Sequence, residues 1–171
     1  MAFYPTENQI GLKAFANIDT TTALPFGTIV RGVDSASGKG GGEFIYLPGV
    51  ASTVVGSLVT YNPIAKTTTL CPDTANLAQP VAVAMAAVAT TGNFGWYQIA
   101  GVAVIKKGAV SVLPNVPVFI GTAAGAGRIT SLASAGKELL NARSVNTTTI
   151  ASGTSTVNVL INRPFAQGQI T

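Results

Sequence analysis

Short runs of β-favouring residues, each closed by turn-forming residues, dominate most of this chain. Val, Ile, Thr and aromatic residues recur in these runs, and Gly, Pro and Asn separate them, which is the pattern of short strands joined by tight connections. The clearest run covers 156–162, where Val157, Val159 and Ile161 recur at every second position. That period of two is typical of a half-buried strand. Pro164 then ends the pairing because it has no N–H to donate.

The same pattern predicts strands along the whole body of the chain. We expect them at 27–31, 43–47, 58–61, 67–70, 81–88, 96–99, 102–105, 116–120, 128–130 and 156–162. Helix is scarce: only 131–140 has a tolerable helical pattern, and Gly136 weakens it. The sequence therefore predicts an all-β fold, a small β-barrel or sandwich of about 8–10 short strands with little helix. Periodicity does not distinguish a barrel from a sandwich, because strand order depends on long-range pairing.

The first 24 residues differ from the rest. They carry isolated large apolar residues among polar ones, at spacings that match neither a helix nor a strand: Phe3, Tyr4, Ile10, Leu12 and Phe15. We interpret 1–24 as an extended N-terminal arm whose apolar residues dock on its own body or on a neighbour, the alternative being a frayed terminus. Residues 25–171 are expected to form a single β-domain, since a chain of 171 residues buries enough surface for one core.

The composition argues against an enzyme. The chain has no His and one Cys, and only 9% of its residues are charged, so the usual acid/base group and the commonest metal ligand are missing. The six acidic residues form no recognisable spaced pair. Cys71 has no His to activate it, and it is expected to be a small buried residue. We predict no catalytic residues, no metal and no cofactor.

Two other motifs are candidate binding sites. SGKGGGEF, at 37–44, lacks the spacing and the following Ser or Thr of a phosphate-binding loop, so a flexible connection is the better interpretation. Trp96 and Tyr97 are candidates for stacking on a sugar or a base. Adjacent strand residues point to opposite faces and cannot form one platform, so we expect one of the two rings in the core and the other at an interface.

Nucleic-acid and membrane partners are disfavoured. The net charge of +4 reflects scarce acids, and the ten basic residues are scattered apart from Lys106-Lys107, whereas nucleic-acid binders gather them on one face. The apolar stretch 80–89 is about half the length of a membrane-spanning helix. The N-terminal residues lack the apolar region of a secretory signal.

A weak internal recurrence links two segments. GSLVTYNPIAKTTTL (56–70) and NVPVFIGTAAGAGRITSL (115–132) share a β-run, a turn-rich connector and a Thr-containing strand, with Val59 and Val118 in like positions. An ancient duplication is one interpretation. The other is that any two β-hairpins look alike at this level.

Several blocks of the sequence resemble a known family. They are GTIVRGVD, GEFIYLPGVASTVVGSLVTYN, PVAVAMAAV and GWYQIAGVAVIK, followed near the C-terminus by NVLINRPF. In these blocks the chain resembles the head decoration, or cement-type, proteins of tailed bacteriophages. The resemblance runs from the arm to about Lys107 and returns at the final strand. It implies a non-enzymatic virion protein on the outer capsid surface, a homotrimer at threefold or quasi-threefold positions, with the major capsid protein as its partner.

On that reading, the interface residues are expected in and near the arm. Phe3, Tyr4 and Phe15 are the candidate apolar anchors, with Ile10 and Leu12 beside them, and Lys13 and Arg31 are candidates for polar contacts with an acidic capsid. The alternatives are another virion component, such as a head fibre base, a minor capsid protein or a tail accessory protein, or a carbohydrate-binding or adhesin module that uses Trp96 or Tyr97.

Overall fold

The computed structural model describes residues 3–5, 13–34, 38–121 and 126–169, and it confirms the predicted all-β fold. No helix occurs in these ranges. The strands are β1 Phe3–Pro5, β2 Ile29–Asp34, β3 Gly40–Pro48, β4 Leu58–Asn62, β5 Thr67–Leu70, β6 Val81–Ala84, β7 Phe94–Lys106, β8 Pro117–Gly121, β9 Arg128–Thr130, β10 Glu138–Ser144 and β11 Thr156–Ala166.

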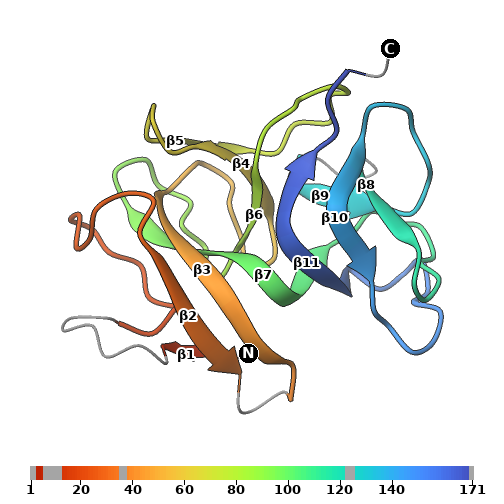
Figure 1. The fold of residues 1–171 in the computed structure, drawn as a ribbon, viewed down its shortest axis with the longest axis horizontal. Coiled ribbons are helices and arrows are strands. Elements are labelled where there is room, and N and C mark those ends of the chain that lie inside the picture. The colour runs from red at the N-terminus through yellow and green to blue at the C-terminus, as the bar shows by residue number, and fades with distance from the viewer. Residues whose placement is uncertain (1–2, 6–12, 35–37, 122–125, 170–171) are drawn as a thin grey trace.

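All these strands belong to one curled antiparallel sheet (Figure 1). Its main path runs β1-β2-β3-β7-β11-β10-β8-β9, and β6 pairs with β7 while also carrying the β4–β5 hairpin. The long strand β7 is central because it pairs with β3 through its first half and with β11 through its second half. The sheet thus divides at β7 into an N-terminal and a C-terminal lobe.

The segment 131–140, which alone has a tolerable helical pattern, does not form a helix. Residues 131–137 form turns, Gly136 has a φ of +74°, and β10 begins at Glu138. Antiparallel pairing of β10 with β11 and β8 stabilises an extended chain there, which local propensity does not report. The strands predicted at 96–99 and 102–105 are parts of the single strand β7, which continues through Ala100 and Gly101.

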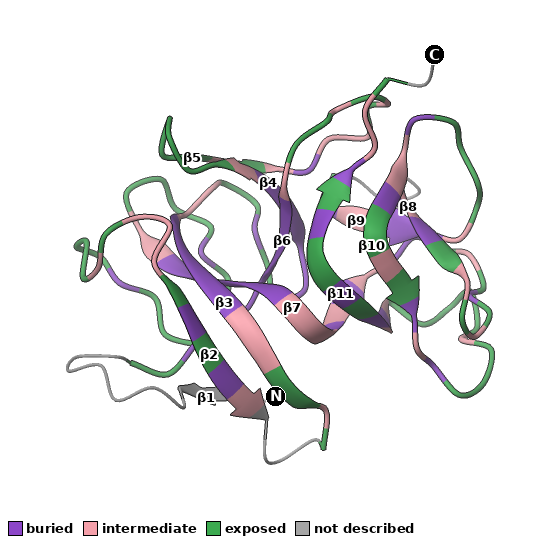
Figure 2. Cartoon of the chain, viewed as in Figure 1, coloured by how far each residue is buried: buried purple, intermediate pink, exposed green. Residues whose placement is uncertain are grey.

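The N-terminal lobe buries both faces of its sheet, as the burial colours of β3 show (Figure 2). Alternate residues of β3 enter two clusters: Phe44 and Tyr46 on one face, Ile45 and Leu47 on the other. Period-two alternation normally leaves one face polar, but a strand covered on both faces becomes a continuous apolar run. The run FIYL within β3 is therefore explained by two layers of cover.

Trp96 and Tyr97 follow the same rule on β7. They point to opposite faces, as expected, with Trp96 in the first cluster and Tyr97 in the second. The prediction that one of them lies at an interface is wrong, since their exposed fractions are 2% and 0%. Neither ring is available to stack on a sugar or a base, because a second layer of the chain covers each face.

The C-terminal lobe packs around an apolar cluster that β4 and β6 also enter, and this cluster includes Leu58, Cys71, Ile105 and Val159. Strand β9 also contacts the residue that follows β7, through a β-bridge between Ile129 and Lys107. Cys71 is fully buried, as predicted, and burial raises the pKa of its thiol to about 12. This thiol is a packing group at neutral pH, because a thiol must be ionised to act as a nucleophile.

The internal recurrence extends beyond two hairpins. The strand order β5-β4-β6-β7 in the first half is matched by β9-β8-β10-β11 in the second. The registers also correspond: Thr60 pairs with Thr69 and Val81, and Phe119 pairs with Thr130 and Glu138. Two unrelated hairpins have no reason to share the next two strands in the same order, so the topology favours duplication.

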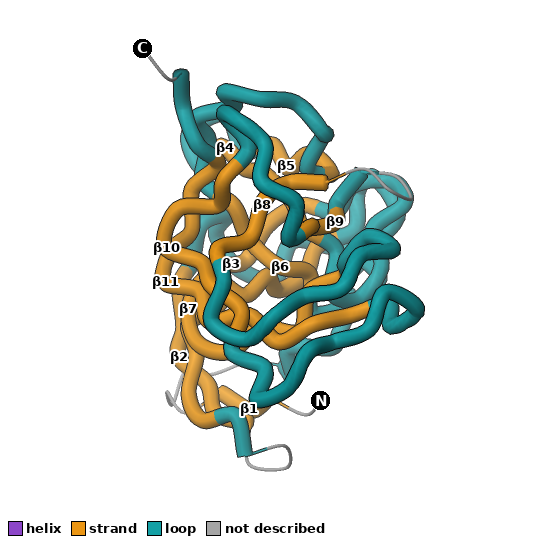
Figure 3. Tube along the Cα trace, turned by 90° about the vertical axis from the view of Figure 1, so that its right-hand side faces the viewer, coloured by secondary structure: helices purple, strands orange, loops and turns teal. Residues whose placement is uncertain are grey.

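The strands and the long loops gather on opposite sides of the molecule (Figure 3). β2, β7, β11 and β10 line one side, which faces the viewer in Figure 1, and the long loops lie on the other. The outward-facing side chains of these strands form what we call the strand side of the protein.

Candidate interface

The segment 13–28 packs on the first cluster of the N-terminal lobe, with Phe15 inside the cluster and Leu24 and Phe26 against it. Phe15, predicted as a docking residue, has an exposed fraction of 1%. Its ring stacks on Phe44 with a centroid distance of 4.0 Å and meets Trp96 edge-on at 5.4 Å. Stacked and edge-on rings at these distances add to the free energy of apolar burial. Phe15 therefore contributes to the core of its own chain.

A buried polar contact holds the same segment in place. The Tyr46 hydroxyl donates to Asp19 Oδ2 at 2.9 Å, and Lys13 Nζ donates to Asp19 Oδ1 at 2.6 Å. The Asp19 backbone also exchanges two hydrogen bonds with Phe94. Lys13, predicted as a capsid contact, is thus half of an ion pair within the chain, with its side chain 56% exposed and that of Asp19 only 8% exposed.

This contact predicts a loss of stability at high pH. Burial raises the pKa of Tyr46 from 10.0 to about 12, and the hydrogen bond from the hydroxyl to Asp19 contributes to the rise. Below pH 10 the contribution of Tyr46 is complete. Between pH 10 and 12 the unfolded chain releases the tyrosine proton while the folded chain keeps it, so the free energy of unfolding falls, by about 2–3 kcal/mol across the window. Urea denaturation at pH 8, 10 and 11.5 measures this fall.

The matched variant for that measurement is Tyr46→Phe. It removes the titrating hydroxyl and keeps the ring, so its free energy of unfolding should fall less steeply above pH 10 than that of the wild type. The other tyrosines and Cys71 titrate in both proteins and cancel in the comparison. Parallel curves for the two proteins would contradict the assignment.

The remaining predicted arm residues lie apart from this segment. Phe3 and Tyr4 lie on β1, where their backbones pair with Asp34 and Val33 of β2. Ile10 and Leu12 lie outside the described residues. The structure thus joins part of the arm to the edge of the sheet and brings Phe15 into the core, and it does not gather the predicted residues into one patch.

Arg31, the last predicted residue, belongs to a charged cluster on the strand side. Its Nε lies 3.6 Å from Oε1 of Glu43 on β3, and its side chain is 72% exposed. The same carboxylate accepts from Nε of Arg163 on β11, and Arg163 Nη2 lies 3.1 Å from Oε2. Two arginines 132 positions apart in the sequence therefore share one glutamate, a pairing that no local pattern indicates.

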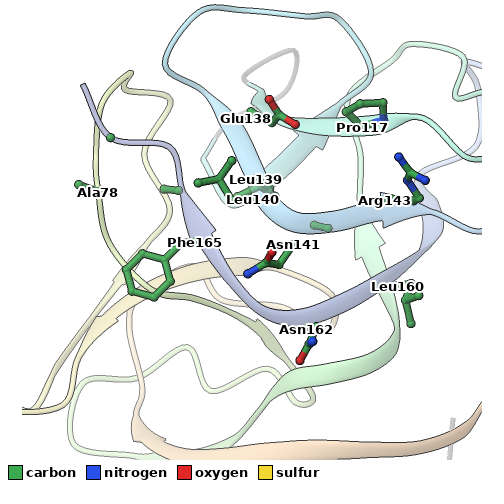
Figure 4. Close-up of a pocket in the computed structure, with 13 residues that line it drawn as sticks. Ala78, Pro117, Glu138, Leu139, Leu140, Asn141, Arg143, Leu160, Asn162 and Phe165 are labelled. Carbon is green, nitrogen blue, oxygen red and sulfur yellow. The ribbon is translucent and has the colours of Figure 1, made fainter. Parts of the chain in front are cut away.

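An apolar groove lies beside this cluster, on the outward face of β10 and β11 (Figure 4). Leu140, Leu160 and Phe165 line it, with exposed fractions of 42%, 47% and 44%. Leu140 stands opposite Phe165 in the register of the two strands, and Leu160 stands opposite Arg143. Leu140 and Phe165 thus lie side by side, and Leu160 lies further along the same two strands, beyond Asn141 and Asn162. Exposed apolar side chains among polar ones are typical of surfaces that bind other proteins.

Sequence reasoning missed this groove, although one signal was present. On β11 the inward positions are Val157, Val159 and Ile161, so Leu160 stands at an outward position where a polar residue is expected. An apolar residue in the polar phase of a strand indicates a contact outside its own core. Leu140 carries no such signal, because its segment has no strand-like alternation and only a weak helical pattern.

No metal or membrane element accompanies these features in the described part of the chain. Among those residues no three His, Cys, Asp or Glu side chains lie together as a metal site requires. No helix within them is long and apolar enough to cross a bilayer.

The strand side therefore has two adjoining features, the apolar groove and the charged cluster, which share the lining residue Asn162 with the neighbouring cleft. No protein-family model matches this chain, and comparison with curated proteins found no significant match.

Proposed function

We propose that this chain is a structural virion protein that binds the outer surface of a tailed-phage capsid and stabilises the head shell. The apolar groove of the strand side is the observation that carries the proposal. Exposed apolar side chains that polar residues surround are typical of surfaces that bind other proteins. The resemblance in the β-blocks names the partner as the major capsid protein, and it implies a homotrimer at threefold or quasi-threefold positions.

Binding energy is sufficient for this role, and no chemical step is required. A protein that binds the assembled shell and not the separated subunits stabilises the shell by the free energy of binding. A trimer gains further because, once one copy is bound, the second and third contacts form at a high effective concentration. The groove would supply the apolar part of each contact.

The composition of purified virions tests the proposal. We expect the chain in mature particles at a copy number of the same order as that of the major capsid protein, and on the outer surface of the head when particles are imaged. A far smaller copy number with density at the tail or at a fibre base would favour another virion component. Absence from the particles would overturn the proposal.

Substitutions in the groove test its part in binding. Leu160→Thr combined with Phe165→Thr removes two exposed apolar side chains and keeps residues suited to a strand. We expect unchanged folding and at least tenfold weaker binding to capsids stripped of their native copies, since interfaces draw most of their energy from a few large side chains. Leu132→Thr is the control, because Leu132 is 63% exposed and lies outside the groove. Equal binding by the double variant and the control would exclude the groove from the contact.

A further inference from the structure

A cleft opens on the strand side where β3 and β7 separate. β3 pairs with β7 from Pro48 down to Glu43, which stands opposite Ala100, and the register shifts at that point. From Ala100 onward β7 pairs with β11, while Gly40–Gly42 continues to pair with β2. The three strands thus diverge around a hollow lined by Arg31, Gly42, Glu43, Gly101, Asn162 and Arg163.

Glycines line the floor of this cleft because the backbones approach closely there. A Cβ on Gly101 would lie 2.5 Å from the carbonyl oxygen of Gly41, and one on Gly42 would lie 2.7 Å from that of Ala100. Gly101 also has a φ of +94°, a conformation that other residues rarely adopt. With no side chains on the floor, a ligand in the cleft reaches the backbone and the groups on the walls.

A β-bulge sets the direction of the Arg163 side chain on one wall of the cleft. Leu140 pairs with Phe165, and Ala142 pairs with Ile161, so Asn141 alone on β10 faces three residues of β11. Arg163 lies within this bulge with a φ of +46°, an uncommon conformation for a residue other than glycine. Bulges redirect side chains and often lie beside functional sites. Here the result is an arginine that reaches Glu43 across β7.

The cluster has more donors than its own acceptor can satisfy. Two guanidinium groups carry five N–H donors each and one positive charge each, and a carboxylate offers about four acceptor positions. Arg31, Arg163 and Glu43 together leave one positive charge in excess, on side chains that are 72% and 61% exposed for the two arginines. A second carboxylate matches both the surplus charge and the fork of N–H groups.

We propose that this arginine cleft binds the carboxylate of an acidic side chain on a partner protein. The apolar groove adjoins it, since Asn162 lines both, so the matching segment places an acidic residue next to an apolar one. The net charge of +4 and the surplus positive charge of the cleft favour an acidic partner. The identity of that partner as the capsid rests on the function proposed above.

Peptide binding tests the cleft without any capsid. The probe is acetyl-Leu-Glu-Leu-amide, and acetyl-Leu-Gln-Leu-amide is its uncharged match. We expect the Glu peptide to shift the NMR signals of the Nε–H groups of Arg31 and Arg163 and the amides of Gly42 and Gly101 saturably, and the Gln peptide to leave them unchanged. Arg31→Gln combined with Arg163→Gln should lower the affinity at least tenfold. Equal shifts by both peptides, or an equal response to inorganic phosphate, would overturn the assignment.

Capsid binding then separates this inference from the proposed function. We expect two single variants, Arg163→Gln and Arg31→Gln, each to weaken binding to stripped capsids roughly tenfold and to reduce the salt dependence of that binding. Arg31 lies outside the bulge, so its variant removes the charge without altering the bulge. Lys66→Gln removes the same charge at the exposed β4–β5 turn and should bind as the wild type does. If the wild type binds and all three variants bind equally, the cleft inference fails and the function stands. If the wild type does not bind capsids while the peptide result holds, the function fails and the cleft stands.

Discussion

Replacing Phe15 by alanine should lower the free energy of unfolding by about 3–4 kcal/mol. The ring is fully enclosed between Phe44 and Trp96, and removing a buried phenyl group costs its transfer free energy and leaves a cavity. Urea denaturation monitored by the fluorescence of Trp96 measures the loss, because this indole lies in edge contact with the ring that is removed. The segment 13–28 should also detach more often, so the amide of Asp19, which donates to Phe94, should exchange faster.

Phe15→Leu is the control for that experiment. It keeps most of the apolar volume and should cost less than about 1.5 kcal/mol. A leucine variant as stable as the wild type would mean that the ring contacts contribute nothing beyond apolar volume. An alanine variant within 1 kcal/mol of the wild type would show that the segment does not cover the cluster as the structure places it.

The second large effect is expected at Lys107, whose exposed fraction is 1%. Its ammonium group donates to three backbone carbonyls, at 3.2 Å to Gly108, 2.7 Å to Val110 and 3.2 Å to Ser152. It thereby joins the chain after β7 to the loop before β11. Burial lowers the pKa of Lys107, and the three carbonyls offset part of the cost of burying its charge by replacing water.

Lys107→Met should therefore cost about 2–4 kcal/mol of stability. Methionine occupies similar space and leaves the carbonyls without their donor. The control is Lys106→Met. Lys106 is the last residue of β7, directly before Lys107, and its side chain points to the opposite side and is partly exposed. Urea denaturation of both variants at pH 7 gives the comparison. Equal stabilities would mean that water replaces the ammonium group at no cost.

Much of the fold could be predicted because its information is local. The alternation of Val157, Val159 and Ile161 predicts β11 and its buried face, and the structure bears out both. The prediction that Pro164 ends the pairing is wrong, because Phe165 and Ala166 still pair with β10. The burial of Cys71 was also predicted, because a cysteine with no histidine to activate it is expected to be a packing residue. The failures have one cause: at β10 and at Tyr97, contacts with distant strands override what the local pattern favours.

The candidate interface was less predictable for the same reason. Arg31 was predicted from the sequence as a polar contact with an acidic capsid, which stays a prediction, and Arg163 and Glu43 join it only when β3, β7 and β11 meet. Phe15 looked like an anchor for a neighbour because a sequence does not say which surface an apolar residue covers. In the structure that surface is the chain's own first cluster.

The sequence by itself determined the all-β class and the positions of most strands, since alternation and turn residues act over a few neighbouring positions. Only the tertiary structure decided that β7 joins two lobes, that a second layer covers Trp96 and Tyr97, and that two distant arginines share one glutamate. Those features depend on which strands pair across the chain. Pairing free energy is realised only when segments far apart in the sequence meet, so no local pattern encodes it.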